Sequence, residues 1–230
     1  KNLNMQYSIV RSKKRKKTIS LQIDADSRIT VYAPGFTPTE EIRRFVQEKQ
    51  NWIIKSLHRQ SLTSLKQREK RYISGESFYY LGRPYPLKAC YEPLDNQGVA
   101  LRNECFFLNC PENKSMRKFY FIAWYKNKAL HYISRRVEHY SRLLELKHGG
   151  IRITSAERRW GSCSESNRLA FSFRLIMAPP EVVDYVVVHE LMHIRQKNHS
   201  SKFWDLVLEV LPDYRTHRLW LRDNEHLFGL

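Results

Sequence analysis

The segment that decides the fold is VVVHELMHIRQKNHSSKFW, residues 186–204, which holds one glutamate and three of the chain's nine histidines. Apolar residues fill its first half, which predicts a buried helix. His189 and His193 are four residues apart on that helix, so both imidazoles project from one face and can hold one metal ion. Glu190 adjoins the first imidazole, where its carboxylate can take a proton from a metal-bound water. The alternative is a core helix that carries two histidines without a metal.

A third ligand argues for the metal site. His199 follows His193 by six residues, and the intervening residues can end the helix, with Asn198 suited to a left-handed turn that brings His199 back. Ser200 is a good N-cap for a following helix. The rival third ligand is Glu209, on that following helix. We predict His199.

The rest of the chain alternates between strand and helix patterns, which predicts an α+β fold. Residues 117–146 and the segment from Pro180 onward read as helices, and two strand-like runs around a hairpin separate them. The PENKSM segment, residues 111–116, suggests a boundary. We therefore expect an N-terminal β-rich subdomain with one helix over residues 1–112, and a domain carrying HELMH over residues 113–230.

The chain is strongly basic, with a net charge of +17 over 230 residues. Such charge favours anionic partners, namely nucleotides, nucleic acid or acidic peptides, although a basic protein without a specific anionic ligand is an alternative. The basic run at residues 13–17 is interpreted as a charged hairpin connection rather than a nucleic-acid patch.

Composition narrows the class of protein. The four cysteines include no CxxC pair, which argues against a zinc ribbon and predicts reduced thiols in the cytoplasm. No apolar run is long enough for a membrane span, and no signal pattern is evident. We therefore expect a cytoplasmic protein without a membrane partner; the sequence does not fix its oligomeric state.

Several longer motifs resemble one family. The run RWGSCSESNRLAFSFRLIMAPPEVVDYVVVHELMHIRQKNHSSKFW, residues 159–204, is similar to the YgjP-like family of metal-dependent hydrolases, which are related to the SprT and WLM groups of metallopeptidases. YSIVRSKKRKKTISLQI (7–23), ITVYAPGFTPTEEIRRFVQEKQNWI (29–53) and YLGRPYPL (80–87) resemble the family's opening. The chain departs from the family at the ESN turn, which lacks the usual glycine, and at Ser172-Phe173, where Asn-Trp is usual.

The resemblance implies a compact zincin-like metallopeptidase domain, with a small mixed sheet beside the active-site helix. By resemblance, His189, His193 and His199 bind the metal and Glu190 is the catalytic acid and base. Zinc is the expected ion, with Mn²⁺ or Ni²⁺ as alternatives, because neutral imidazoles suit these ions.

The strand before the helix is the expected substrate-binding element. By resemblance Arg159, Gly161, Ser162 and Cys163 lie near the metal, and the glycine permits close approach of a substrate backbone. Cys163 is interpreted as a small buried residue rather than an inhibitory thiol. Arg159 and Arg174 could bind a substrate carboxylate or phosphate, or could be structural ion-pair partners.

Three functions remain open at this point. We favour a zinc-dependent metallopeptidase in which Glu190 activates a zinc-bound water. The first alternative is a nucleoside triphosphate (pyro)phosphohydrolase on the same site, because the family resemblance does not fix the substrate. The second is a DNA-associated protease that docks on nucleic acid through its basic surface. Peptide, nucleotide and nucleic acid are thus the partners to be distinguished.

Overall fold

The computed structural model describes two compact units, Lys1–Arg68 and Glu69–Leu230. Within them the structure is described for residues 6–12, 15, 18–24, 27–57, 70–90, 97–110 and 113–230. The division between Arg68 and Glu69 replaces the boundary that we expected at residues 112 and 113.

The first unit is a small sheet covered by a helix. Its strands β1 (Ser8–Ser12), β2 (Ser20–Ile23) and β3 (Ile29–Pro34) lie in the order β1-β3-β2, with β1 parallel and β2 antiparallel to β3. The helix α1 (Thr39–Glu48) buries one apolar face. The small core consists of Ile29, Val31, Ala33, Ile42, Val46 and Ile53.

The expected hairpin between the first two strands does not form, because both strands pair with β3 instead. Four residues of the basic run at 13–17 lie outside the described residues; Arg15 donates to the Ser20 hydroxyl at 2.8 Å.

The second unit begins with a four-stranded sheet in the order β4-β5-β7-β6. Its strands are β4 (Ser77–Tyr80), β5 (Arg83–Cys90), β6 (Gly98–Arg102) and β7 (Cys105–Asn109). Phe78 and Phe106 from this sheet pack against Phe121 of the long helix α3 (Lys114–Leu143), with the Phe78 and Phe121 ring centroids 4.2 Å apart. The sheet and the helix therefore share one core, which is why no boundary falls near residue 112.

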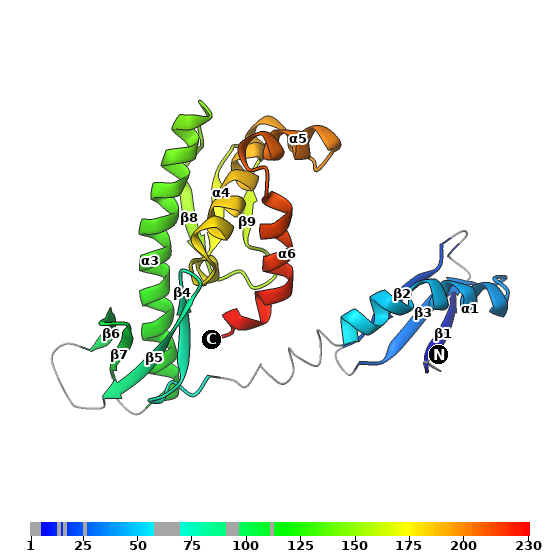
Figure 1. Ribbon diagram of the computed structural model, residues 1–230, viewed down its shortest axis with the longest axis horizontal. Helices are drawn as coiled ribbons and strands as arrows, with labels where there is room; N and C mark the ends of the chain where they lie inside the picture. The colour runs from blue at the N-terminus through cyan, green and yellow to red at the C-terminus, as the bar shows by residue number, and fades with distance from the viewer. Residues whose placement is uncertain are drawn as a thin grey trace. The chain divides into compact units, whose positions relative to one another are not determined.

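The HELMH segment lies on α4 (Pro180–Arg195), one side of which faces α3. A second small sheet combines β8 (Ile151–Thr154), β9 (Gly161–Cys163) and β10 (Leu169–Ser172) in the order β8-β10-β9. The 3-10 turn η1 (Phe173–Met177) leads into α4. Then α5 (Ser201–Val210), α6 (Tyr214–Asn224) and the 3-10 turn η2 (Glu225–Phe228) complete the unit (Figure 1).

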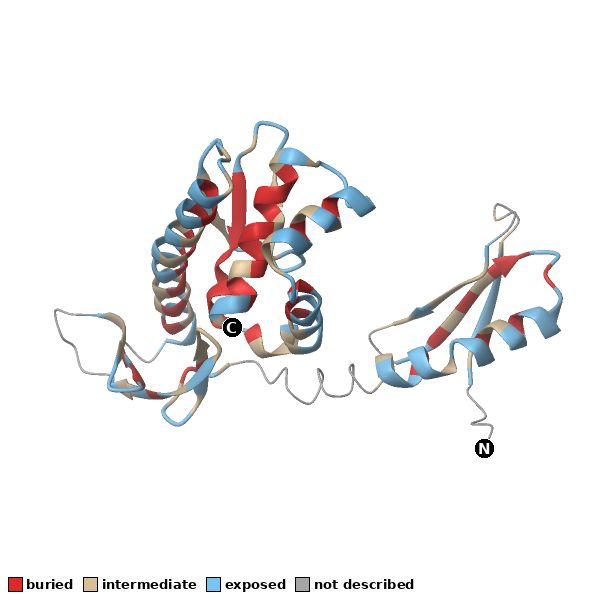
Figure 2. Cartoon of the chain, turned by 45° about the horizontal axis from the view of Figure 1, so that its top comes forward, coloured by how far each residue is buried: buried red, intermediate tan, exposed pale blue. Residues whose placement is uncertain are grey.

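The helix α4 forms where the sequence predicts it. Pro179 and Pro180 preset the backbone at its start, and Glu181 lies in the first turn, where a carboxylate favours the helix dipole. Most of the helix is buried, as Figure 2 shows, because it contacts α3, α5, α6 and β9. Neighbouring elements therefore enclose most of this apolar helix, and its exposed residues lie at its two ends.

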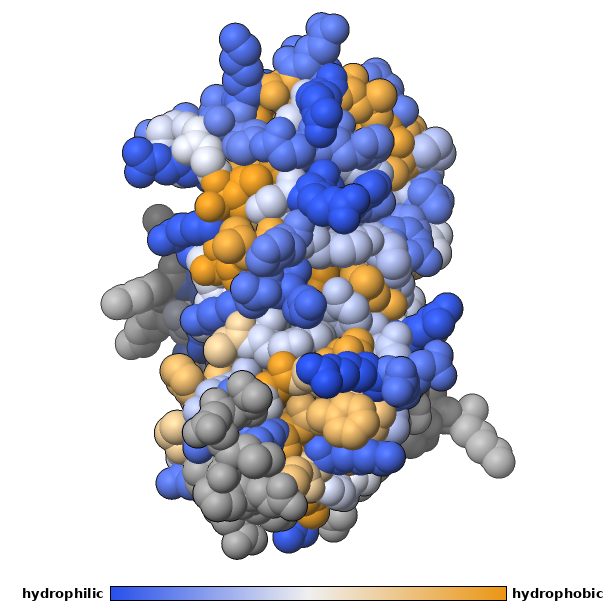
Figure 3. Space-filling model, turned by 90° about the vertical axis from the view of Figure 1, so that its left-hand side faces the viewer, coloured by the Kyte–Doolittle hydropathy of each residue, from blue (hydrophilic) through white to orange (hydrophobic). Residues whose placement is uncertain are grey.

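The opposite face of α3 is open to solvent. Its exposed apolar side chains, including Phe119, Leu130 and Leu143, are interspersed with hydrophilic ones (Figure 3). In the described part of the chain no helix is long and apolar enough to cross a membrane. The α+β fold, with a small mixed sheet beside the HELMH helix and a β-rich N-terminal part, is confirmed.

Candidate metal centre

Three imidazoles meet at the end of α4. His189 and His193 come from consecutive turns of the helix, and His199 comes from the turn that follows it. One nitrogen of each ring lies within 4.8 Å of the other two. The Nε2 atoms of His189 and His199 are 3.0 Å apart. The cluster thus contains His199, and it does not contain the rival Glu209, which is exposed on α5.

A short turn places His199. Asn198 was expected to adopt a left-handed conformation, but it is not among the residues with positive φ. Instead its side-chain oxygen accepts hydrogen bonds from Gln196 Nε2 at 2.8 Å and from the Ser200 backbone N–H at 3.2 Å. Ser200 occupies the N-cap of α5 as predicted, although its side chain makes no capping hydrogen bond. The asparagine side chain, rather than its backbone, therefore closes the turn.

The imidazoles are prepared to bind a metal. The Gln196 carbonyl can only accept, so His193 Nδ1 donates to it at 3.0 Å and leaves Nε2 as the free ligand atom. Burial, with smaller contributions from the charges of His193 and His199, lowers the pKa of His189 to about 3. A neutral imidazole is the form that binds a metal. Three imidazoles that each offer one nitrogen are a donor set that fits a catalytic zinc ion, which keeps its fourth position for water or substrate.

An aromatic wall supports the cluster. The Phe203 ring lies 4.5–4.9 Å from the centroids of all three imidazoles. Trp204 lies 5.7 Å from both His189 and His199. Both aromatic residues belong to the first turn of α5, so this helix limits the rotation of the rings and keeps water from one side of the cluster.

Glu190 is buried on the same helix, with 5% of its surface exposed. It lies directly against β9, since a Cβ built on Gly161 would be 2.6 Å from the Glu190 Cγ and Oε1 atoms. We expected Gly161 to admit a substrate backbone; the structure shows that it makes room for the glutamate side chain. Glu190 and His189 line the same cavity of about 380 Å³.

Burial also changes the acidity of this carboxyl. Removal from water raises the pKa of Glu190 to about 8 in the metal-free protein, and the positive charge of Arg159 opposes that rise. A group with a pKa near neutrality can both take up and release a proton.

The raised pKa predicts a pH-dependent stability of the metal-free protein. The unfolded carboxyl ionises near pH 4.5, whereas the folded one keeps its proton until about pH 8. The stabilisation is therefore complete below pH 4.5 and is lost as the pH rises through 8. We expect the free energy of unfolding to fall by about 1.4 kcal/mol per pH unit in this interval, relative to Glu190→Gln.

Urea unfolding of both metal-free proteins across this pH range measures the effect. The difference between the two proteins isolates Glu190, because the other titrating groups are common to both. Parallel stability curves would contradict the raised pKa.

Three of the other predicted residues line a second cavity, of about 630 Å³, next to β9. They are Arg159, Ser162 and Cys163. Burial raises the pKa of the Cys163 thiol more than the nearby Lys197 lowers it, so the thiol remains protonated. Cys163 is not part of the histidine cluster. Cys163 is partly buried rather than fully buried as we predicted, and its side chain is open to this cavity.

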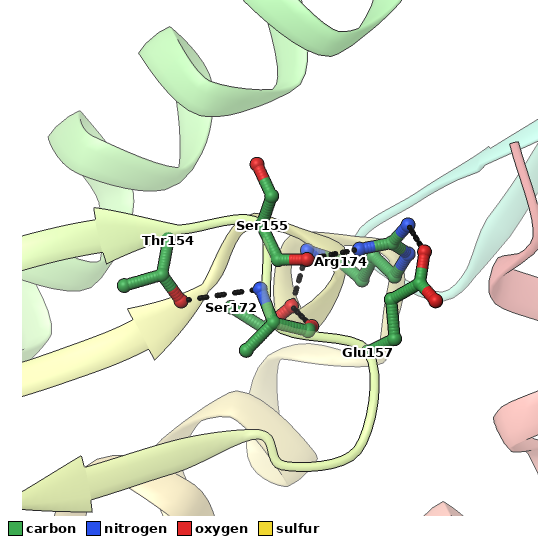
Figure 4. Close-up of polar contacts among 6 residues, drawn as sticks. Thr154, Ser155, Glu157, Ser172 and Arg174 are labelled. Atoms are coloured by element: carbon green, nitrogen blue, oxygen red, sulfur yellow. Dashed lines mark hydrogen bonds and ion pairs between the residues drawn. The ribbon is translucent and has the colours of Figure 1, made fainter.

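Arg174 is held elsewhere. Its guanidinium donates to the Ser155 carbonyl at 3.1 Å and pairs with Glu157 at 2.9 Å (Figure 4). It lines neither of the two cavities beside β9. We predicted that Arg174 binds substrate or forms a structural ion pair. Its contacts with Ser155 and Glu157 fit the structural ion pair.

Sequence reasoning missed Arg218. It lies on α6, lines the cavity that contains His189 and Glu190, and places its guanidinium 4.8 Å from the Trp204 ring centroid. Tyr185, one turn before His189 on the same helix, lies 5.9 Å from the His189 ring. The helical spacing of Tyr185 and His189 was a usable signal. No local pattern indicated that α6 would reach the cavity.

A protein family and a solved structure are similar to this chain. A family model described as "YgjP-like, metallopeptidase domain" matches residues 17–224. Among solved structures, the metallopeptidase zymogen of Pyrococcus abyssi abylysin is similar at 21% identity and a TM-score of 0.36, over 39% of this chain and 93% of that chain. No curated protein is significantly similar to the chain.

Proposed function

The chain belongs to the YgjP-like metallopeptidase family, which makes it a metal-dependent hydrolase, and from this premise we propose that it is a zinc peptidase. His189, His193 and His199 hold the ion, and Glu190 is the catalytic acid and base. The observation that carries the proposal is the meeting of three imidazoles, all within 4.8 Å, beside a buried glutamate. The family match confirms the resemblance predicted from the sequence.

Glu190 is the proton carrier in this proposal. A bound zinc ion would supply Lewis acidity and would lower the pKa of a water molecule. Glu190 takes the proton from the attacking water and then delivers it to the leaving amine. The contact with Gly161 fixes the carboxyl against β9, and Arg159 offsets the negative charge that the carboxylate carries between the two transfers.

The edge of β9 supports a peptide substrate. In the sheet order β8-β10-β9, only one side of β9 is paired within the described chain. An extended peptide can add to the other side through backbone hydrogen bonds. Because Gly161 of this strand touches Glu190, a peptide bound there would pass close to the proton carrier.

A substrate panel tests the proposal. The zinc-loaded protein is incubated with unfolded proteins, with a fluorogenic peptide library and with nucleoside triphosphates, and Glu190→Gln provides the background. We expect new peptide termini, detected by mass spectrometry, and no release of phosphate or pyrophosphate. Hydrolysis of triphosphates without peptide cleavage would assign the site to nucleotides instead. Loading with Mn²⁺ or Ni²⁺ in place of zinc tests the choice of ion.

Gly161 provides a second test. The methyl group of Gly161→Ala would overlap the Glu190 side chain and displace the carboxyl. We expect kcat to fall about 10²-fold, as is typical of a misplacement of about 1 Å, while bound zinc is unchanged. Gly35→Ala is the matched control, because a methyl group there meets nothing within 4 Å. An unchanged kcat in Gly161→Ala would show that the contact does not position Glu190.

A further inference from the structure

The cavity of about 630 Å³ beside β9 is basic. Three arginines line it: Arg152 on β8, Arg159 just before β9, and Arg168 just before β10. No aspartate or glutamate is among its lining residues; the rest are glycines, serines, a cysteine and apolar residues. The cavity therefore gathers three positive charges, of which Arg159 also acts on Glu190 and the other two face no acidic lining residue.

None of these three guanidiniums forms an ion pair within the described chain. By contrast, the neighbouring Arg174 is paired with Glu157, and Arg136 of α3 is paired with Asp184. Arg152, Arg159 and Arg168 are exposed, so solvent and salt screen part of their mutual repulsion, but their shared positive potential still attracts anions to the cavity. An anionic ligand removes the repulsion, and the planar guanidinium is suited to a carboxylate that accepts two hydrogen bonds.

The strand register connects this cavity to the proposed substrate. Ala170 of β10 pairs with Arg152 on one side and with Ser162 of β9 on the other. These three residues form one row across the sheet and alternate with the row of Leu169, so their side chains lie on the opposite face. All three line the cavity, which also reaches the neighbouring row of Ile151, Leu169 and Cys163. A peptide added to the free edge of β9 would extend this row, so its residue opposite Ser162 would point to the arginine face.

Gly161, the neighbour of Ser162, belongs to the other face, where it touches Glu190. The side chains of the added peptide would therefore alternate between the face of the proton carrier and the face of the arginines. We propose that this cavity is a specificity site for an acidic side chain of the substrate, at the position opposite Ser162. The proposal rests on the peptidase function proposed above.

Matched peptides and arginine variants test the proposal. The bond cleaved by the wild-type protein is first located by mass spectrometry, and peptide pairs then place glutamate or glutamine at each position around it. The test variant is Arg152→Gln/Arg168→Gln; Arg159 is left in place because its charge acts on Glu190. The control variant, Arg102→Gln/Arg158→Gln, removes the same charge from exposed positions that do not line the cavity.

We expect one position at which the wild type and the control prefer glutamate by about tenfold in kcat/KM. The test variant should lose this preference, and added salt should weaken it in the wild type. Equal cleavage of both peptides by the wild type, or a preference that survives in the test variant, would overturn the acidic-side-chain site while leaving the peptidase function intact.

A binding assay separates the two proposals. Fluorescence anisotropy of the labelled peptides is measured with metal-free protein, where hydrolysis plays no part. A binding preference for glutamate that disappears in the test variant supports the acidic-side-chain site, whether or not any peptide is cleaved. Absence of cleavage would refute only the peptidase function. Tighter binding of a nucleoside triphosphate than of any glutamate peptide, lost in the same variant, would assign the cavity to phosphate and overturn the proposal.

Discussion

Glu190→Gln is expected to lower kcat by about 10²–10⁴-fold, which is the usual contribution of general acid–base catalysis. Glutamine has nearly the same shape as glutamate, so it can occupy the space against Gly161, but it cannot carry a proton. KM should change little, because Glu190 acts on the attacking water rather than on the bound chain. Steady-state kinetics on the peptide identified in the substrate panel measure both constants.

The metal content of this variant is the essential control. Glu190 is not part of the histidine cluster, so Glu190→Gln should bind zinc as the wild type does. Loss of activity together with loss of zinc would indicate a structural role for Glu190. Full activity with zinc bound would remove Glu190 from the mechanism.

His199→Ala is expected to have the second large effect. It removes one of three ligand atoms. Loss of a residue that only hydrogen-bonds to a ligand weakens metal binding by up to about 10²-fold, so loss of a ligand itself should weaken zinc binding by at least that factor. Activity should fall in proportion to occupancy. Zinc retained after dialysis against a graded series of chelators, measured by mass spectrometry, gives the affinity.

Glu209→Ala is the matched control for the ligand assignment. Both residues are exposed near the same helix, yet only His199 joins the cluster. We therefore expect Glu209→Ala to retain zinc and activity. The reverse result, in which His199→Ala keeps its zinc and Glu209→Ala loses it, would transfer the third-ligand role to the glutamate.

Local patterns predicted those parts of the fold and the site that depend on local geometry. The four-residue spacing of His189 and His193 sets their common face on any helix, and Pro180 marks where that helix begins. The position of Ser200 as an N-cap was equally readable. Features of this kind depend on a few neighbouring residues, so a single sequence is sufficient to predict them.

Contacts between distant segments could not be read in the same way. Gly161 was noticed as a glycine beside the site, but only the packing of β9 on α4 shows that its partner is Glu190. The alternation around Phe78 and Phe106 predicted strands with a buried face. It did not indicate that this face would be covered by α3, which is why the expected boundary at residues 112 and 113 was misplaced.

The contact of Phe203 with all three imidazoles has a thermodynamic consequence. His199 adjoins Ser200, the N-cap of α5, and Phe203 belongs to the first turn of that helix, so the metal-binding conformation and a docked α5 require each other. Any ion that binds only the docked state lowers the population of locally unfolded molecules by mass action. The amide protons of α5 should then exchange with solvent more slowly as zinc is added. The exchange rate of the α5 amides would therefore measure the fraction of the protein that holds a metal ion.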